Sequence, residues 1–197
     1  MWLQYRSIKV FAFVGAVTPG PVNLLATSTA VQQGSIQAFK HVLGASFAYA
    51  GVVYLSGSVL STVSDKLPML ESSMQLVGSG FLIWLAYKIA SAPVGNIEVE
   101  QRTASGWVTG ALAQLLNPKA WLVAMSGVSV YVVGQMNPLQ WLWTFTFISL
   151  GACLIGVGVW ALLGKLLAAY LSQPNKQRIF NRAMAIILVM SVSMMWL

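Results

Sequence analysis

Two short motifs combine residues that break a helix with side chains that could bind a small solute. The first is Thr18-Pro19-Gly20-Pro21-Val22-Asn23, and the second is Asn117-Pro118-Lys119. Each interrupts an apolar segment that would otherwise form one continuous helix, because proline removes a backbone donor and clashes with the preceding turn. The N–H groups that begin a helical segment attract a carboxylate, and the carbonyls that end one attract an ammonium. Two such breaks brought together could therefore hold a zwitterion.

Lys119 is the charge whose position is most informative. It lies about 13 residues, or roughly 20 Å, beyond Gly106, where the fourth apolar segment begins. A lysine at this depth costs about 2.5–3.5 kcal/mol on insertion scales, so it requires a partner, and an anionic substrate group would serve. The alternative is a helix that begins at Pro118 and leaves Lys119 at the membrane surface. That helix would have only about 16 residues, which is short for a span, so we favour the deep position.

Neutral polar side chains complete the expected substrate site. Asn23 and Asn117 can both donate and accept hydrogen bonds, so each could contact a substrate, satisfy backbone groups freed by the prolines, or do both. Tyr49 lies on the next segment and could reach the first break, although packing is the commoner role of an interior tyrosine. We expect His41 at a membrane edge and Gln114 in a bond between helices. The predicted substrate-binding residues are Pro19, Gly20, Pro21, Asn23, Tyr49, Asn117, Pro118 and Lys119.

The composition is that of a membrane protein. Of the 197 residues, 57% are hydrophobic and 8% are charged, whereas a soluble domain carries roughly 25% charged residues. The net charge of +7 then indicates topology and not nucleic-acid binding. A single cysteine, Cys153, provides neither a disulfide framework nor a redox pair. Because no metal-ligand cluster, hydrolytic centre or nucleotide-binding loop is visible, we expect no enzyme activity, cofactor or metal.

Apolar segments of about 20 residues predict six membrane-spanning helices. They cover about residues 8–31, 42–63, 69–90, 106–133, 139–163 and 183–197. The last is short, so we expect its start to reach back to Ile179. The single transporter domain, 1–197, would comprise halves of about 1–92 and 105–197, separated by a polar loop at 93–104. Three spans per half is an odd number, so the second half must insert upside down. The predicted fold class is an all-α membrane protein with two inverted three-helix repeats, each starting with a broken helix.

The basic residues predict how the chain is oriented. Those in the links after the first, third and fifth spans are Lys40, Lys88, Arg102, Lys165, Lys176, Arg178 and Arg182. The other side has only Arg6, Lys9 and Lys66. The richer side is expected in the cytoplasm, which places both termini in the periplasm.

Small residues indicate where helices pack closely. Gly44 with Ala48, and Gly106 with Gly110, have the spacing of four residues that lets two helices approach one another. We expect packing at these positions and no direct part in function.

These motifs resemble those of the LysE/RhtB amino-acid exporter family. The resemblance rests on residues 18–25, Gly44 and residues 116–121, and it extends over essentially the whole chain in length, apolar segments and central loop. Residues 84–90 also resemble the cysteine/O-acetylserine exporter branch. The resemblance implies proton-driven export of small amino acids or derivatives across the bacterial inner membrane. Many members carry Gly-Asp where this chain has Ala48-Tyr49, so any coupling role of that Asp would need another group here.

The sequence therefore predicts a multi-pass secondary transporter of the bacterial inner membrane. Its partners would be the lipid bilayer and an amino-acid substrate, and a homo-oligomer is compatible with the sequence. One half would rock against the other around the site formed by the broken helices. The alternative left open is a passive channel or a structural membrane subunit without coupled transport.

Overall fold

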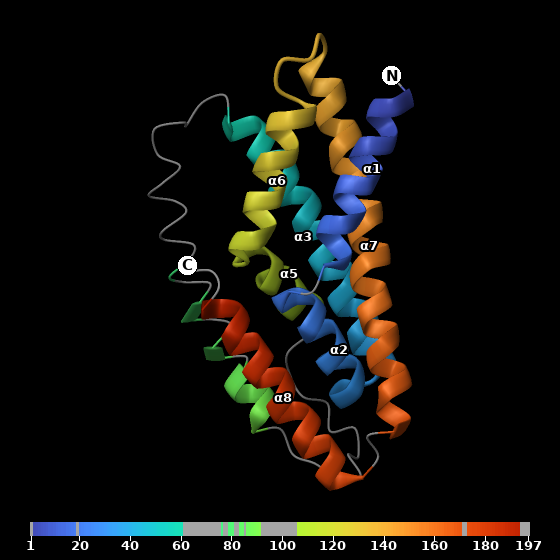
Figure 1. The fold of residues 1–197 in the computed structure, drawn as a ribbon, viewed down its shortest axis with the longest axis vertical. Helices are drawn as coiled ribbons and strands as arrows, with labels where there is room; N and C mark the ends of the chain where they lie inside the picture. The colour runs from blue at the N-terminus through green and yellow to red at the C-terminus, as the bar shows by residue number, and fades with distance from the viewer. Residues whose placement is uncertain are drawn as a thin grey trace.

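The computed structural model describes residues 2–18, 20–60, 76, 79–80, 83–84, 86–91, 106–170 and 173–193. All regular secondary structure in these residues is helical, which confirms the all-α class. The helices, labelled as in Figure 1, are α1 Trp2–Val17, α2 Pro21–Gln33, α3 Ser35–Leu60, α5 Gly106–Leu115, α6 Pro118–Tyr131, α7 Pro138–Tyr170 and α8 Pro174–Ser193. The polar loop at 93–104 and most of the predicted third span lie outside the described residues. The arrangement of six helices in two repeats therefore stays a prediction.

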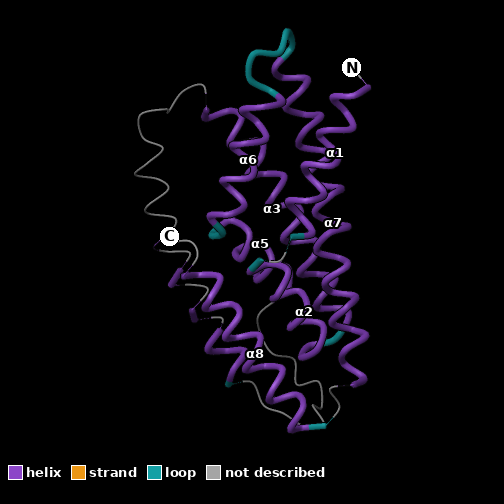
Figure 2. The backbone as a smooth tube through the Cα atoms, in the orientation of Figure 1, coloured by secondary structure: helices purple, strands orange, loops and turns teal. Residues whose placement is uncertain are grey.

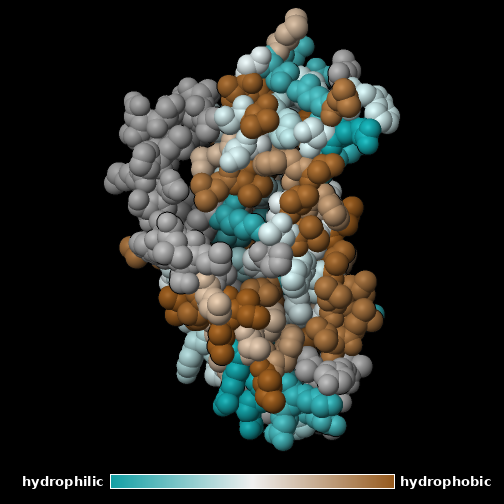
Figure 3. Space-filling model, viewed as in Figure 1, coloured by the Kyte–Doolittle hydropathy of each residue, from teal (hydrophilic) through white to brown (hydrophobic). Residues whose placement is uncertain are grey.

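Two of the described helices, and one bent pair, have the length and polarity expected of membrane spans. Residues Ser35–Ser58 of α3 and Pro138–Leu167 of α7 are each long and apolar enough to cross a bilayer. α1 and α2 together make a third candidate span, bent by 56° at the break between them. On the face shown in Figure 3, hydrophilic residues gather at the upper right and at the lower end. Among the described residues between them, hydrophobic ones predominate around a hydrophilic patch at mid-height.

Both predicted helix breaks are present. α1 ends at Val17 and α2 begins at Pro21, and α5 ends at Leu115 before α6 begins at Pro118. A proline opens each second segment, a position where its missing N–H costs nothing. The two broken helices run in opposite directions and both breaks lie at mid-height (Figures 1 and 2). Lys119 therefore follows the half-helix α5 and is not at the start of a membrane span. This is the arrangement that a position deep in the membrane requires.

The polar link predicted between the first two spans is wrong. Gly34 adopts a positive φ of 83°, which ends α2, and α3 begins at the next residue, Ser35. Lys40 and His41 therefore lie inside a helix. The expectation of an interfacial His41 is also wrong, because its side chain is completely buried and its Nε2 lies 3.2 Å from the Val22 carbonyl oxygen. The polar residues between the two spans predicted a loop, but Gly34 alone is enough to turn the chain.

The basic link predicted before the last span is also shorter than expected. α7 continues through Lys165 to Tyr170, and α8 begins at Pro174, well before residue 183. Lys176 and Arg178 thus belong to the first turns of this helix. Charged residues at the ends of α7 and α8 therefore lie in helices, where the sequence predicted a connecting segment.

Glycines allow α3 and α5 to cross in backbone contact. A Cβ atom built on Gly44 would lie 2.1 Å from the Trp107 carbonyl oxygen, and one on Gly110 would lie 2.1 Å from the His41 carbonyl oxygen. Gly106 is equally close to the backbone of Gln37. The expectation of packing at these glycines is confirmed. The crossing holds α5, and with it the second break, against the long helix α3.

We expect Gly44→Ala to destabilise the protein by about 1–3 kcal/mol, because the added methyl group would force the α3 and α5 backbones apart. Gly51→Ala is the matched control on the same helix, since a Cβ there meets nothing within 4 Å. Thermal unfolding of the purified protein in detergent measures both. Equal melting temperatures for the two variants would show that the crossing is not as tight as described.

Candidate substrate site

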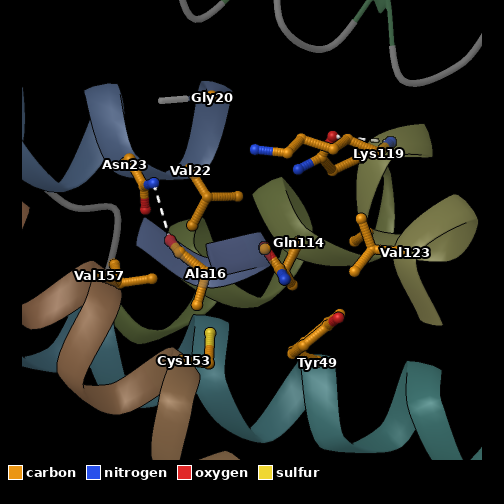
Figure 4. A pocket seen from close by; sticks show the side chains of 13 residues that line it. Ala16, Gly20, Val22, Asn23, Tyr49, Gln114, Lys119, Val123, Cys153 and Val157 are labelled. Carbon is orange, nitrogen blue, oxygen red and sulfur yellow. Dashed lines mark hydrogen bonds between the residues drawn. The ribbon is translucent and has the colours of Figure 1, made fainter. Parts of the chain in front are cut away.

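A pocket lies between the two helix breaks (Figure 4). Its cavity volume is about 40 Å³, which is room for a few water molecules at roughly 10–15 Å³ each. Five of the predicted substrate-binding residues line it: Gly20, Asn23, Tyr49, Asn117 and Lys119. The two breaks, which are about a hundred residues apart in the sequence, thus contribute to one pocket.

Of the three predicted prolines, the structure describes the side chain of Pro21 alone, and Pro21 does not line the pocket. Pro21 is buried in the first turn of α2. Pro118 opens α6, but its side chain is not among the groups described, and Pro19 lies outside the described residues. Pro21 therefore shapes the first break, and neighbouring residues provide functional groups of the pocket.

Side chains satisfy the carbonyl groups that the first break leaves at the end of α1. Asn23 Nδ2 donates to the carbonyl oxygens of Ala16, at 3.0 Å, and Thr18, at 2.9 Å. Trp160 Nε1 of α7 donates to the carbonyl oxygen of Val17 at 3.0 Å. The sequence left open whether Asn23 contacts substrate or backbone, and the structure shows the backbone contact.

The second break uses the same two residue types. Asn117 caps α6, because its Oδ1 accepts from the backbone N–H of Lys119 at 3.2 Å. Trp121 Nε1 donates to the carbonyl oxygen of Leu115, the last residue of α5, at 2.8 Å. An asparagine and a tryptophan therefore stabilise each break, although the tryptophan of the first break comes from a distant helix.

Lys119 connects the two breaks. Its Nζ donates to the Thr18 carbonyl oxygen at 3.0 Å, across 101 positions of the sequence. This carbonyl lies at the negative end of the α1 dipole, where a cation is stabilised. The sequence suggested an anionic substrate group as the partner of this lysine, whereas the structure supplies a backbone oxygen. The described residues that line the pocket include neither Asp nor Glu.

The opposite side of the pocket is formed by the two long helices. Tyr49 of α3 and Cys153 of α7 lie there, facing the side that carries Asn23 and Lys119 (Figure 4). Gln114, near the end of α5, also lines the pocket. Gln114 is a polar residue one turn before the second break, and this position could have indicated a pocket residue. The sequence analysis instead predicts a hydrogen bond between helices for it. Nothing in the sequence distinguished Cys153 from other buried residues of an apolar run.

Comparison with known proteins identifies the family. Residues 13–193 match the LysE type translocator family. The chain belongs to this family. The cysteine/O-acetylserine efflux proteins of Escherichia coli (strain K12) and Salmonella typhi are each 28% identical to this chain over 179 residues, which cover 91% of this chain and 90% of each relative. No solved structure matches the chain. The resemblance seen in the motifs is thus confirmed.

Membership of the LysE type translocator family gives the pocket its context. The motifs that carried the resemblance, residues 18–25 and 116–121, are the segments that form the two breaks. A translocator needs a place in its apolar interior where a solute can be held, and irregular backbone at such a depth is tolerated where it lines a cavity. The pocket between the breaks is the candidate for that place.

We expect Trp160→Phe to weaken the first break. The change keeps an aromatic ring but leaves the Val17 carbonyl oxygen without its side-chain donor, at a cost of about 1–3 kcal/mol for an unsatisfied buried group. Thermal unfolding of the purified protein is the measurement. Trp143→Phe, on the same helix, is the control, because its indole makes ring contacts but no hydrogen bond to the described residues. Equal stability of both variants would exclude a supporting role for the Trp160 indole.

Proposed function

We propose that this LysE type translocator is a secondary transporter that exports small neutral amino acids or their derivatives across the bacterial inner membrane. The observation that carries the proposal is the meeting of two broken helices at one pocket, with the Lys119 ammonium between them. The names of the two bacterial relatives support cysteine and O-acetylserine as the first substrates to test. Both are zwitterions.

The two ends of the first break suit the two charges of such a substrate. α2 has no side chain capping its N-terminus, and Gly20 and Val22 of its first turn line the pocket. Its N–H groups and the Lys119 ammonium can bind a carboxylate. The carbonyl oxygens at the end of α1 can bind an ammonium. Asn117 and Gln114 would add contacts from the second break, and Tyr49 and Cys153 would contact the substrate side chain.

Alternating access is proposed as the mode of transport. The opposite directions of the two broken helices support an inverted relationship between the halves of the chain (Figure 1). In this proposal the halves rock about the pocket, and the basic side of the protein faces the cytoplasm. Coupling to protons is part of the proposal. All four acidic residues of the chain, Asp65, Glu71, Glu98 and Glu100, lie outside the described residues.

Lys119→Met tests the site. The change removes the ammonium but keeps a long side chain, and we expect export to fall about ten- to a hundredfold, because a hydrogen bond to a charged group contributes about 1.5–3 kcal/mol. The measurement is tolerance of toxic cysteine in a strain that overproduces the protein, with the amount of folded protein checked by size-exclusion chromatography. Lys165→Met, at an exposed position of α7, is the matched control. Unchanged tolerance in the Lys119 variant would remove this residue from the mechanism.

Transport by the purified protein in liposomes tests the coupling. We expect flux of radiolabelled cysteine to saturate with concentration and to rise when a pH gradient is imposed, because a secondary transporter moves one solute down its gradient to drive another. A channel or structural subunit would give neither result. A panel of other radiolabelled amino acids in the same vesicles would define the substrate range, and saturable flux that ignores the gradient would contradict proton coupling.

A further inference from the structure

The ammonium of Lys119 already occupies a position that the proposed function assigns to the substrate. Its Nζ lies 3.0 Å from the carbonyl oxygen of Thr18, the residue that follows α1. The last helical backbone bond of α1 runs from Thr18 N to Val14 O, so the Thr18 carbonyl has no partner within the helix. This oxygen is the natural acceptor for a substrate ammonium.

The Thr18 carbonyl oxygen already accepts two hydrogen bonds in this structure. It accepts from Asn23 Nδ2 at 2.9 Å as well as from Lys119 Nζ, and the Asn23 side chain is itself buried, with 4% exposed. A carbonyl oxygen has two lone pairs, and both are engaged. A substrate ammonium can bind this oxygen only if it takes the place of Lys119.

Both ends of the Lys119 residue are held. Its backbone N–H donates to Asn117 Oδ1 at the start of α6, and its side chain extends toward Gly20 and the end of α1 (Figure 4). A Cβ built on Gly20 would lie 3.4 Å from Nζ and 3.6 Å from Cδ of the lysine. The lysine therefore lies against Gly20, at the part of the pocket where the first break is open.

We propose that Lys119 stands in for the substrate ammonium, and that only a solute with both a carboxylate and an ammonium displaces it. The substrate carboxylate pairs with the lysine, since a charge-assisted bond is stronger than one to a neutral carbonyl. The ammonium of the same molecule then takes the vacated position on the Thr18 oxygen. This inference rests on the proposed function and names zwitterions as the class of substrate that the site selects.

The exchange accounts for selectivity through the cost of unpaired charge. A cation in apolar surroundings is expensive unless it is paired. An amine without a carboxylate would take the Thr18 oxygen from Lys119 and bring no anion in exchange for the lost bond. A carboxylate without an ammonium would draw Lys119 away and leave the Thr18 oxygen short of a donor. Only a zwitterion brings both a carboxylate for the lysine and an ammonium for the Thr18 oxygen. After the exchange the substrate lies between these two groups.

Chemical rescue of Lys119→Ala tests whether the Thr18 oxygen is an ammonium site. n-Propylammonium replaces the atoms that the substitution removes. We expect it to raise the melting temperature of the purified variant by about 2–4 °C at saturation, and to leave the wild-type protein unchanged. Trimethylpropylammonium, which has the charge but no N–H donor, is the matched control and should have no effect. Equal responses of variant and wild type to n-propylammonium would overturn the proposal.

Competition for bound radiolabelled cysteine tests the exchange in the wild-type protein, so it does not depend on the folding of any variant. Cysteamine lacks the carboxylate and N-acetylcysteine lacks the ammonium. We expect each to compete about tenfold more weakly than cysteine, or worse, because each leaves one charge-assisted bond unmade. In Lys119→Met, cysteamine should bind more tightly than it does to the wild type and approach the affinity of cysteine for the same variant.

The two assays separate this inference from the function on which it rests. If the wild type binds cysteine and cysteamine equally, the exchange is wrong while amino-acid transport stands. If the wild type binds and transports no amino acid, the proposed function fails, and n-propylammonium rescue still decides whether Lys119 occupies an ammonium site.

Discussion

The need to satisfy backbone groups at two helix breaks governs this structure. In apolar surroundings each unpaired carbonyl or N–H group costs several kcal/mol. Ala16, Val17 and Thr18 end α1 with carbonyl groups that accept from Asn23, Trp160 and Lys119. Asn117 and Trp121 do the same work at the second break. Asn23, Asn117 and Lys119 satisfy backbone groups at the breaks and also line the pocket, so the stability of the breaks and the chemistry of the site share these side chains.

Two long helices hold the broken ones in place. α7 packs against both α1 and α2, and its glycines permit close approach: Gly156 meets the backbone of Ala16, and Gly164 that of Thr27. Between these two contacts Trp160 reaches α1 with its indole and accepts a hydrogen bond from Thr27 with its carbonyl oxygen. α3 supports α5 through a second glycine crossing. Unbroken helices thus fix the angle at which the half-helices meet.

The pocket combines a cation with neutral oxygen acceptors, and this balance suits a transporter. A lysine paired with a carboxylate would hold its partner strongly, whereas a carbonyl oxygen can be exchanged for a substrate carboxylate at smaller cost. The same contact joins the first break to the second, so the state of the lysine and the relative position of the two broken helices are linked. Binding and movement can then depend on one interaction.

The sequence by itself determined the membrane class, the position of both breaks and the family, because composition, proline and glycine act locally. It also brought Asn23, Tyr49, Asn117 and Lys119 to attention as polar groups in apolar segments. Only the tertiary structure decided what they contact. The acceptor of Lys119 is a backbone oxygen 101 positions away, and the donor to Val17 is an indole 143 positions away. Every residue carries a carbonyl group, so residue types cannot reveal which one a distant side chain will reach. That choice depends on how the helices cross.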